Sequence, residues 1–134
     1  MTENIALIEL AEQVSLRYEG GTPDAPEVGE SDTYDSVLLD ADGAKVGTLT
    51  GRGKVAYRRP TDDHVMAYYQ EELTLSDGTI TTEGWIDGND IQAGKWQTLS
   101  ATGTTGRYAG WTGVRMLRME DAHKVFRTSI FLYA

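Results

Sequence analysis

The feature that most constrains the fold is an Asp-Gly pair, Asp77-Gly78, between two β-prone runs. Asp-Gly readily takes the positive φ angles of a tight two-residue turn, so the pair predicts a β-hairpin. In the run before it, apolar or aromatic side chains alternate with mostly polar ones and occupy the odd positions Val65, Ala67, Tyr69, Leu73 and Leu75. A period of two indicates a half-buried strand whose odd side chains, Tyr69 among them, face a core or a cavity.

Similar short runs fill the rest of the chain and predict about eight antiparallel strands. Besides the hairpin arms they lie at residues 8–18, 34–40, 45–58, 95–104, 114–119 and 125–133. The first run also contains helix formers, so a helix over its first turns is an alternative. Eight strands suffice to close a sheet around side chains or one small ligand, and closure removes exposed edges. We therefore expect an all-β fold, an eight-stranded antiparallel up-and-down β-barrel, with a β-sandwich as the second choice.

Size and charge narrow the classes of function. The 134 residues fit one domain, residues 1–134, and the net charge is −9. Such a surface repels nucleic acid and anionic membranes, so we expect neither as a partner. A membrane-length apolar run, a secretory signal and cysteine are all absent from the sequence, which fits a cytoplasmic location. The acidic, Gly- and Pro-rich residues 20–30 predict a loop that is either a lid over the barrel mouth or a solvated connection.

The sequence lacks the signatures of several catalytic classes. The two histidines have no ligand spacing, so no metal site is expected, and there is no nucleophile elbow or dinucleotide fingerprint. The unusual residues are charges on apolar faces: Glu12, Glu71 and one of Arg115 and Arg118, whose spacing directs them to opposite sides of a strand. A buried charge needs a partner, and such a pair is either a structural ion pair or part of a functional site.

Several short motifs occur at the spacing found in one enzyme family. They are Tyr68-Tyr69-Gln70-Glu71, Leu75-Ser76-Asp77-Gly78, Glu83-Gly84-Trp85, Asn89-Asp90, Lys95-Trp96, Ala101-Thr102-Gly103, Gly106-Arg107-Tyr108 and residues 110–113. With these motifs the chain resembles the spirotetronate cyclases, the Diels–Alderases of bacterial spirotetronate polyketide biosynthesis. The resemblance is close over residues 45–119 and loose in the N-terminal third. It implies an allene oxide cyclase-like or lipocalin-like barrel, a homodimer that uses no cofactor and no metal.

The resemblance also implies a substrate and a reaction. The substrate is a linear polyketide that bears a conjugated diene and a tetronate with an exocyclic methylene. An intramolecular 4+2 cycloaddition joins these groups into a cyclohexene spiro-fused to the tetronate. A pericyclic step of this kind needs no nucleophile, which agrees with the missing catalytic triad. Two other functions stay open: a non-catalytic, lipocalin-like carrier of small molecules, and an allene oxide cyclase-type isomerase of an oxidised fatty acid.

The resemblance also implies roles for individual residues. Tyr69 matches the tyrosine that contacts the tetronate and is the expected catalytic hydrogen-bond donor, with a core tyrosine as the alternative. Arg115 matches an inward arginine and Glu12 its partner, so the two are expected to pair near the barrel mouth and to latch the loop of residues 20–30. The expected substrate contacts are Arg115, Tyr34 at an aromatic position near the mouth, and Leu99 and Leu117, where a relative carries aromatic residues.

Overall fold

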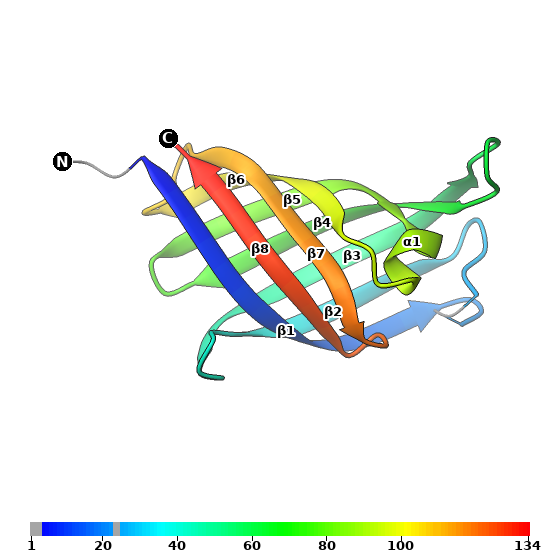
Figure 1. Cartoon of the computed structure of the whole chain (residues 1–134), viewed down its shortest axis with the longest axis horizontal. Coiled ribbons are helices and arrows are strands. Elements are labelled where there is room, and N and C mark those ends of the chain that lie inside the picture. Colours follow the sequence, from blue (N-terminus) through cyan, green and yellow to red (C-terminus); the bar gives the residue numbers. More distant parts are fainter. Residues whose placement is uncertain (1–3, 23–24) are drawn as a thin grey trace.

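Eight antiparallel strands close into one barrel in a computed structural model that describes residues 4–22 and 25–134 (Figure 1). The strands are β1 (Ile5–Glu19), β2 (Ser31–Leu39), β3 (Lys45–Arg58), β4 (Val65–Leu75), β5 (Gly78–Asp87), β6 (Gln97–Gly106), β7 (Thr112–Asp121) and β8 (Val125–Tyr133). Each strand pairs with its neighbours in sequence, and β8 pairs with β1 to close the sheet. The predicted up-and-down barrel is confirmed, and β1 is a strand rather than a helix.

A short helix, α1 (Gly88–Gln92), lies between β5 and β6, before the predicted strand at residues 95–104. Asp87 caps it, because its side chain accepts hydrogen bonds from the backbone N–H groups of Asn89 and Asp90. In Figure 1, α1 lies at the same end of the barrel as the β1–β2 loop and the β3–β4 turn, and we call this end the rim. Within the described part of the chain, no helix is long and apolar enough to cross a membrane.

The central hairpin forms where the sequence predicted it, but its turn is shifted by one residue. Leu75 pairs with Gly78, so the turn residues are Ser76 and Asp77 rather than Asp77 and Gly78. Neither Asp77 nor Gly78 has a positive φ angle. Glycine is needed at position 78 for another reason: a Cβ there would lie 2.5 Å from the carbonyl oxygen of Thr105 on β6. Gly78 therefore permits the close approach of two strands.

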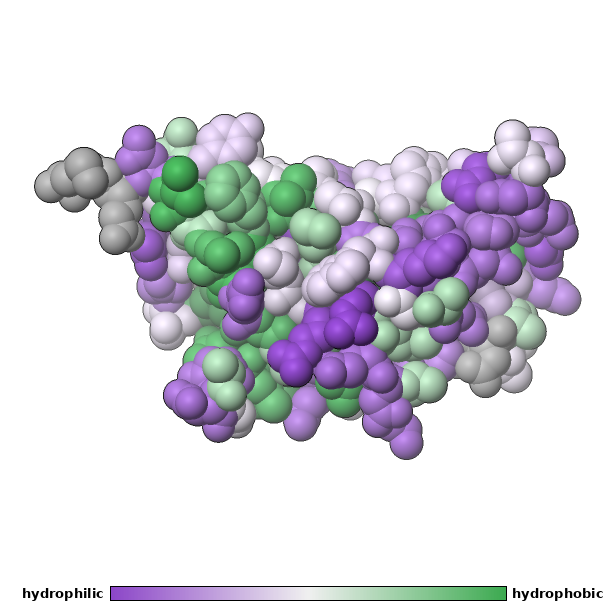
Figure 2. Space-filling model, in the orientation of Figure 1, coloured by the Kyte–Doolittle hydropathy of each residue, from purple (hydrophilic) through white to green (hydrophobic). Residues whose placement is uncertain are grey.

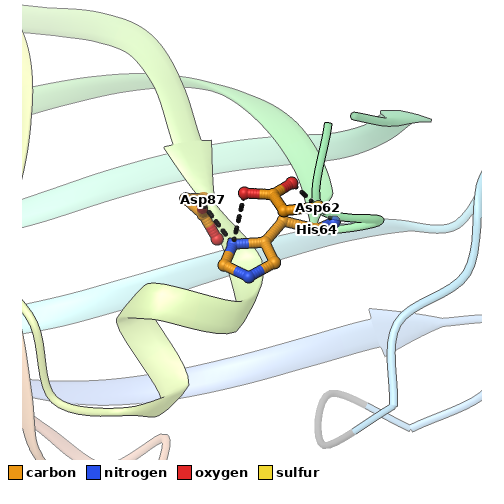
Figure 3. A group of neighbouring side chains, drawn as sticks. All are labelled: Asp62, His64 and Asp87. Carbon is orange, nitrogen blue, oxygen red and sulfur yellow. Dashed lines mark hydrogen bonds and ion pairs between the residues drawn. The ribbon is translucent and has the colours of Figure 1, made fainter. Parts of the chain in front are cut away.

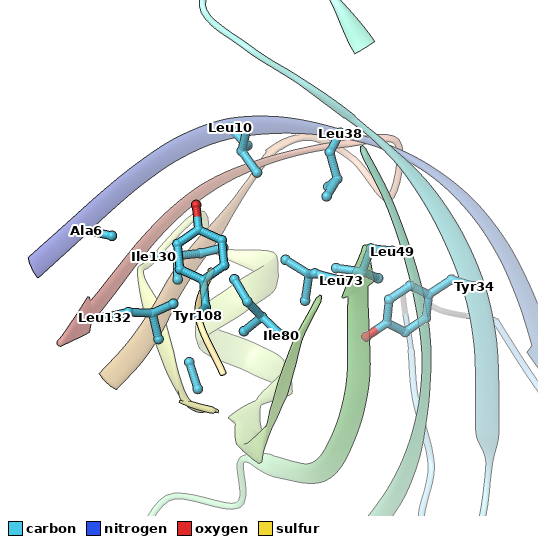
Figure 4. Packing of buried hydrophobic residues seen from close by; sticks show 11 residues of the cluster. Ala6, Leu10, Tyr34, Leu38, Leu49, Leu73, Ile80, Tyr108, Ile130 and Leu132 are labelled. Carbon is cyan, nitrogen blue, oxygen red and sulfur yellow. The ribbon is translucent and has the colours of Figure 1, made fainter. Parts of the chain in front are cut away.

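A packed apolar core fills the end of the barrel that carries the chain termini (Figure 4). Its buried residues come from most of the strands and from the β6–β7 connection; they are Ala6, Leu10, Tyr34, Leu38, Leu49, Leu73, Ile80, Ala101, Tyr108, Ile130 and Leu132. In Figure 4 the ring of Tyr108 points into the interior beside Ile130 and Leu132. This apolar packing fills one end of the barrel, and the rim half of the interior lies outside this core.

A buried ion-pair network borders this core. Arg115 is fully buried, and its guanidinium donates to Glu12 of β1 and to Glu71 of β4. Thr128 donates to Glu12 at 2.9 Å, and Thr82 donates to Glu71 at 2.7 Å. Burial raises the pKa of Glu12, and the charge of Arg115 opposes this effect. We call Glu12, Glu71 and Arg115 the buried triad.

The structure thus brings Glu12 and Arg115 together, as the sequence led us to expect, but at a different depth. Glu12 follows Leu10 of the core on the inner face of β1, so the pair lies deep in the barrel rather than near its mouth. Its hydrogen-bond partners, Arg115 and Thr128, belong to β7 and β8 and not to the loop of residues 20–30. Arg118 points outward, with its guanidinium 5.4 Å from the centre of the Trp96 ring.

Removing the cation of the buried triad should destabilise the fold. Arg115→Met leaves two buried carboxylates without a counter-ion, so we expect a loss of about 3–5 kcal/mol of unfolding free energy in denaturant titrations at pH 7. The matched control is Arg127→Met on β8, which removes only an exposed pair with Glu120 and should cost at most about 1 kcal/mol. Equal losses in the two variants would show that the triad does not hold the barrel together.

Candidate active site

A cavity of about 100 Å³ occupies the rim half of the barrel interior. Glu12 and Glu71 of the buried triad lie at its inner end, whereas Pro26 of the β1–β2 loop and Ile91 of α1 lie toward the rim. Most of the remaining wall is apolar. Such a chamber suits a largely apolar ligand that is oriented by a few polar groups.

The predicted site residues divide into those that line this cavity and those that lie behind it. Tyr34, Tyr69, Leu117 and Glu12 line it. Among the described residues, Leu99 and Arg115 do not belong to the lining. Leu99 is 1% exposed and packs with Ile86 and Leu117, and Arg115 lies behind the two glutamates. In this structure neither Leu99 nor Arg115 is therefore placed to contact a ligand directly.

A glycine on β3 makes room for the ring of Tyr69. Gly53 pairs with Asp32 of β2 on one side and with Tyr69 of β4 on the other. A Cβ on Gly53 would lie 2.3 Å from the Tyr69 ring, so the ring lies where a side chain would be. Tyr69 crosses β3 in this way, and its hydroxyl comes close enough to the Asp32 carboxylate for each group to shift the pKa of the other. We call this row the Asp32–Tyr69 rung.

The next row toward the core also joins a tyrosine to a carboxylate across a glycine, but here the tyrosine is on β2 and the carboxylate is on β4. Gly51 pairs with Tyr34 of β2 and with Glu71 of β4. A Cβ on Gly51 would lie 2.5 Å from the Tyr34 ring, which crosses β3 and donates its hydroxyl proton to Glu71. The centres of the Tyr34 and Tyr69 rings are 6.1 Å apart. The cavity wall therefore carries two adjacent tyrosine–carboxylate pairs that run in opposite directions.

Burial controls the protonation of these groups. It raises the pKa of Asp32 to about 6, with the charge of Glu71 adding to the effect and the hydrogen bond from Tyr69 opposing it. It also raises the pKa of Tyr69 well above its usual value, so Tyr69 stays a protonated donor near neutral pH. Burial is also the main reason that the pKa of Tyr18 rises to about 12. Among the described residues, the buried Tyr18 hydroxyl has no hydrogen-bond partner.

Asp32 is a site residue that the sequence analysis missed. The second strand was expected to begin at residue 34, whereas β2 begins at Ser31. Asp32 has the same parity as Tyr34, Ser36 and Leu38, and all four are buried. Extending the alternation by two residues would therefore have placed this carboxyl group on the inner face.

A separate charged cluster lies at the rim (Figure 3). His64 Nδ1 is 2.8 Å from Asp87 Oδ2, and Arg59 Nη2 is 2.7 Å from the same oxygen while also contacting Asp62. The hydrogen bond to Asp87 is the main reason that the pKa of His64 is raised. Because Asp87 caps α1, the cluster ties the β3–β4 turn to the helix beside the cavity.

The same cluster has the composition of a metal site, which the spacing of the two histidines did not suggest. One ligand atom each from Asp62, His64 and Asp87 lies within 4.8 Å of the others. Arg59 contacts both carboxylates and already supplies the compensating positive charge. A metal cation would have to displace this guanidinium, so we interpret the cluster as an ion-pair network that braces the rim.

Comparisons with known proteins find that the chain is similar to enzymes that catalyse cycloadditions. The chain is 40% identical (TM-score 0.89) to a nonspecific heme-binding cyclase that catalyses a 4+2 cycloaddition during neoabyssomicin biosynthesis; the match covers 98% of this chain and 65% of that one. It is 41% identical (TM-score 0.87) to the Diels–Alderase AbmU from Streptomyces koyangensis, with coverages of 96% and 63%. AbnU, an exo-specific intermolecular Diels–Alderase, is 28% identical (TM-score 0.87), with coverages of 98% and 100%.

The extent of these matches differs between relatives. The chain spans less than two thirds of the first two proteins, 65% and 63% of their lengths, but the whole of AbnU. A pyocyanin demethylase, 21% identical with a TM-score of 0.72, shares the fold. The family model described as the allene oxide cyclase barrel like domain matches residues 11–132, which include nearly the whole closed sheet. The chain therefore belongs to the allene oxide cyclase barrel like domain family.

Proposed function

We propose that this protein catalyses an intramolecular 4+2 cycloaddition of a linear polyketide that bears a conjugated diene and an exocyclic-methylene tetronate, giving a spirotetronate. The observation that carries the proposal is the likeness of the whole barrel to a 4+2 cyclase and two Diels–Alderases at 28–41% identity. The apolar cavity with a buried tyrosine donor in its wall supports it independently. The bond-forming step needs neither a cofactor nor a metal.

The chain's own residues would act by positioning and by one hydrogen bond. The apolar wall holds a flexible substrate folded, with diene and dienophile in contact, and positioning contributes up to roughly 7–11 kcal/mol in the best intramolecular cases. Tyr69 donates a hydrogen bond to the tetronate carbonyl. This bond polarises the dienophile and strengthens as charge develops in the transition state. Tyr69 suits this role because its raised pKa keeps the hydroxyl protonated.

Incubation with a linear tetronate triene separates the proposal from its alternatives. A cyclase forms the spiro product faster than the uncatalysed reaction does. A lipocalin-like carrier binds the triene saturably and leaves the rate unchanged. An allene oxide cyclase-type isomerase does not convert the triene but converts an unsaturated fatty-acid epoxide. Supplying diene and dienophile as separate molecules tests whether the reaction is intermolecular, as it is for AbnU.

We propose further that residues 20–30 form a lid; residues 23 and 24 of this loop lie outside the described residues. Pro26 lines the cavity near the rim. The loop is anchored to β3 by Gly29, whose N–H donates to the Val55 carbonyl at 2.9 Å, and by Glu30, whose carbonyl accepts from Val55 N–H at 2.9 Å. Opening the loop breaks few bonds and leaves the barrel intact. We also propose a cytoplasmic location, which the cysteine-free sequence fits.

A second copy of the chain is the proposed partner. An apolar patch lies on the outer surface near the termini (Figure 2) and consists of Ile5, Leu7, Val114, Met116, Phe131 and Tyr133 of β1, β7 and β8. Phe131 is paired with Leu7 on one side and Val114 on the other, so the patch is continuous across three strands. Copies with a net charge of −9 repel one another, and this uncharged surface suits self-association as a homodimer.

Tyr69→Phe should slow cyclisation by about tenfold to a hundredfold in single-turnover assays, because it removes one hydrogen bond worth roughly 1.5–3 kcal/mol in the transition state. Tyr68→Phe is the matched control, since this neighbour lies on the outer face and donates to Glu83 at 2.7 Å. An unchanged rate in folded Tyr69→Phe protein would refute its role as donor. Complete loss of activity would refute positioning as the main source of catalysis.

Leu117→Trp should impair turnover of the native substrate, because the larger ring fills part of the cavity that Leu117 lines. The expected effect is a raised KM and a lower kcat/KM. Leu117→Met keeps the volume nearly constant and should retain activity. We also expect a roomier cavity, and bulkier substrates, than in relatives with an aromatic residue at position 117. Normal turnover by Leu117→Trp would mean that this side chain does not contact the substrate.

Phe131→Glu should convert the homodimer into a monomer in sedimentation velocity experiments, because it places a charge at the centre of the apolar patch. Tyr57→Glu is the control: Tyr57 is 41% exposed, close to the 39% of Phe131, but lies outside the patch on β3. Dissociation of both variants, or of neither, would place the interface elsewhere.

A further inference from the structure

The Asp32–Tyr69 rung contains a carboxyl group that the proposed reaction does not use. Asp32 is 7% exposed and lines the cavity from β2. Because folding raises its pKa, ionisation of Asp32 costs stability as pH rises above the pKa of the unfolded chain. A carboxyl group kept in a cavity at such a cost, beside a hydroxyl with a proposed catalytic role, suggests a function.

We propose that Asp32 is a positioning residue that decides which acceptor receives the hydroxyl proton of Tyr69. The inference rests on the proposed function, in which Tyr69 donates to the substrate carbonyl. An ionised carboxylate can accept hydrogen bonds but cannot donate one, so ionised Asp32 accepts the hydrogen bond of the Tyr69 hydroxyl. The Tyr69 proton then points toward Asp32 and away from the substrate. When Asp32 is protonated, its O–H donates to the Tyr69 oxygen and the Tyr69 proton is directed to the substrate. The cycloaddition itself then transfers no proton between the residues and the substrate.

The geometry limits this change to the hydroxyl group. The Tyr69 ring lies against Gly53 on one side and near the Tyr34 ring, 6.1 Å between centres, on another. The ring therefore cannot move far, whereas its O–H can turn about the C–O bond between Asp32 and the cavity. The second rung offers no such choice, because Tyr34 donates to Glu71, and Glu71 also binds the Arg115 cation. An ion-paired carboxylate has little tendency to take up a proton.

The surroundings of Asp32 favour uptake of a proton. Tyr18 of β1 pairs with it directly, Tyr69 and Glu71 face it from β4, and Gly53 is its neighbour on β3. The other titratable groups that line the cavity are Glu12 at the inner end, Tyr34 on β2 and His123 in the β7–β8 turn. The Arg115 cation is bound by Glu12 and Glu71. A ligand that covers Asp32 removes more water from it and favours the protonated form further.

The first test needs no substrate. Carbon-detected titration of protein labelled with ¹³C-aspartate should give Asp32 a pKa of about 6. Tyr69→Phe should raise the pKa of Asp32 further, because it removes a hydrogen bond to the ionised form. Tyr34→Phe removes the hydroxyl of the other rung and should change the pKa of Asp32 less. An ordinary pKa for Asp32, or one that does not respond to Tyr69→Phe, overturns the proposal whether or not the protein is a cyclase.

The second test is the pH dependence of cyclisation. Wild-type kcat/KM should fall by about an order of magnitude between pH 5.5 and pH 7.5, as Asp32 ionises. Asp32→Asn should make the profile flat, because an amide can donate to the Tyr69 oxygen at every pH. Asp35→Asn is the control: this residue lies on the same strand, pairs with Arg17 at 3.0 Å and is exposed, so the wild-type profile should persist.

Each outcome of the second test is decisive. A flat wild-type profile, or a wild-type profile in Asp32→Asn, overturns the proposal. If no variant cyclises a tetronate triene, the proposed function has failed and the role of Asp32 toward that substrate fails with it. The NMR titration then still decides by itself whether Asp32 and Tyr69 are coupled. Failure of the positioning role and failure of the proposed function are therefore distinguishable.

Discussion

The buried guanidinium of Arg115 is the charge on which the arrangement of the barrel interior depends. It joins β7 to carboxylates from β1 and β4, so strands on different sides of the barrel must meet at one depth. Two carboxylates share this one cation, and the remaining acceptor capacity is met by the hydroxyls of Thr82, Thr128 and Tyr34. The Tyr34 hydroxyl therefore already has a partner at the inner end of the cavity. Of the cavity tyrosines, Tyr18 and Tyr69 remain for a ligand.

The glycines of β3 explain how polar pairs form within an apolar wall. Residues on β2 and β4 are normally separated by the side chains of the strand between them. At positions 51 and 53 that side chain is missing, and each tyrosine ring occupies the space. Glycines within a strand commonly permit the tight bends of a small barrel. In the structure they also let a tyrosine reach a carboxylate two strands away.

Period-two alternation located much of the site from the sequence. It correctly turned Glu12 and Tyr69 inward and placed Arg115 and Arg118 on opposite faces, and the family resemblance identified Arg115 as the inward one. It fails where the alternation is interrupted: Tyr57 has the same parity as the buried Val55, but the register of β3 shifts between them and Tyr57 is 41% exposed. It also failed at strand ends, as with Asp32, because end residues carry little pattern of their own.

The alternation of side chains along a strand does not predict how deep in the barrel each side chain lies. Parity says that Glu12 and Arg115 face the interior, but the stagger of eight tilted strands decides whether they meet at the mouth or at the floor. The structure places them at the floor, bordered by the core. The Asp32–Tyr69 rung lies one row closer to the rim on both β2 and β4. A ligand that enters from the rim therefore reaches the titratable Asp32 and its tyrosine before it reaches the triad, whose charges already satisfy one another. This order favours holding a polar head group midway along the cavity wall, with the apolar chain folded against the surrounding side chains.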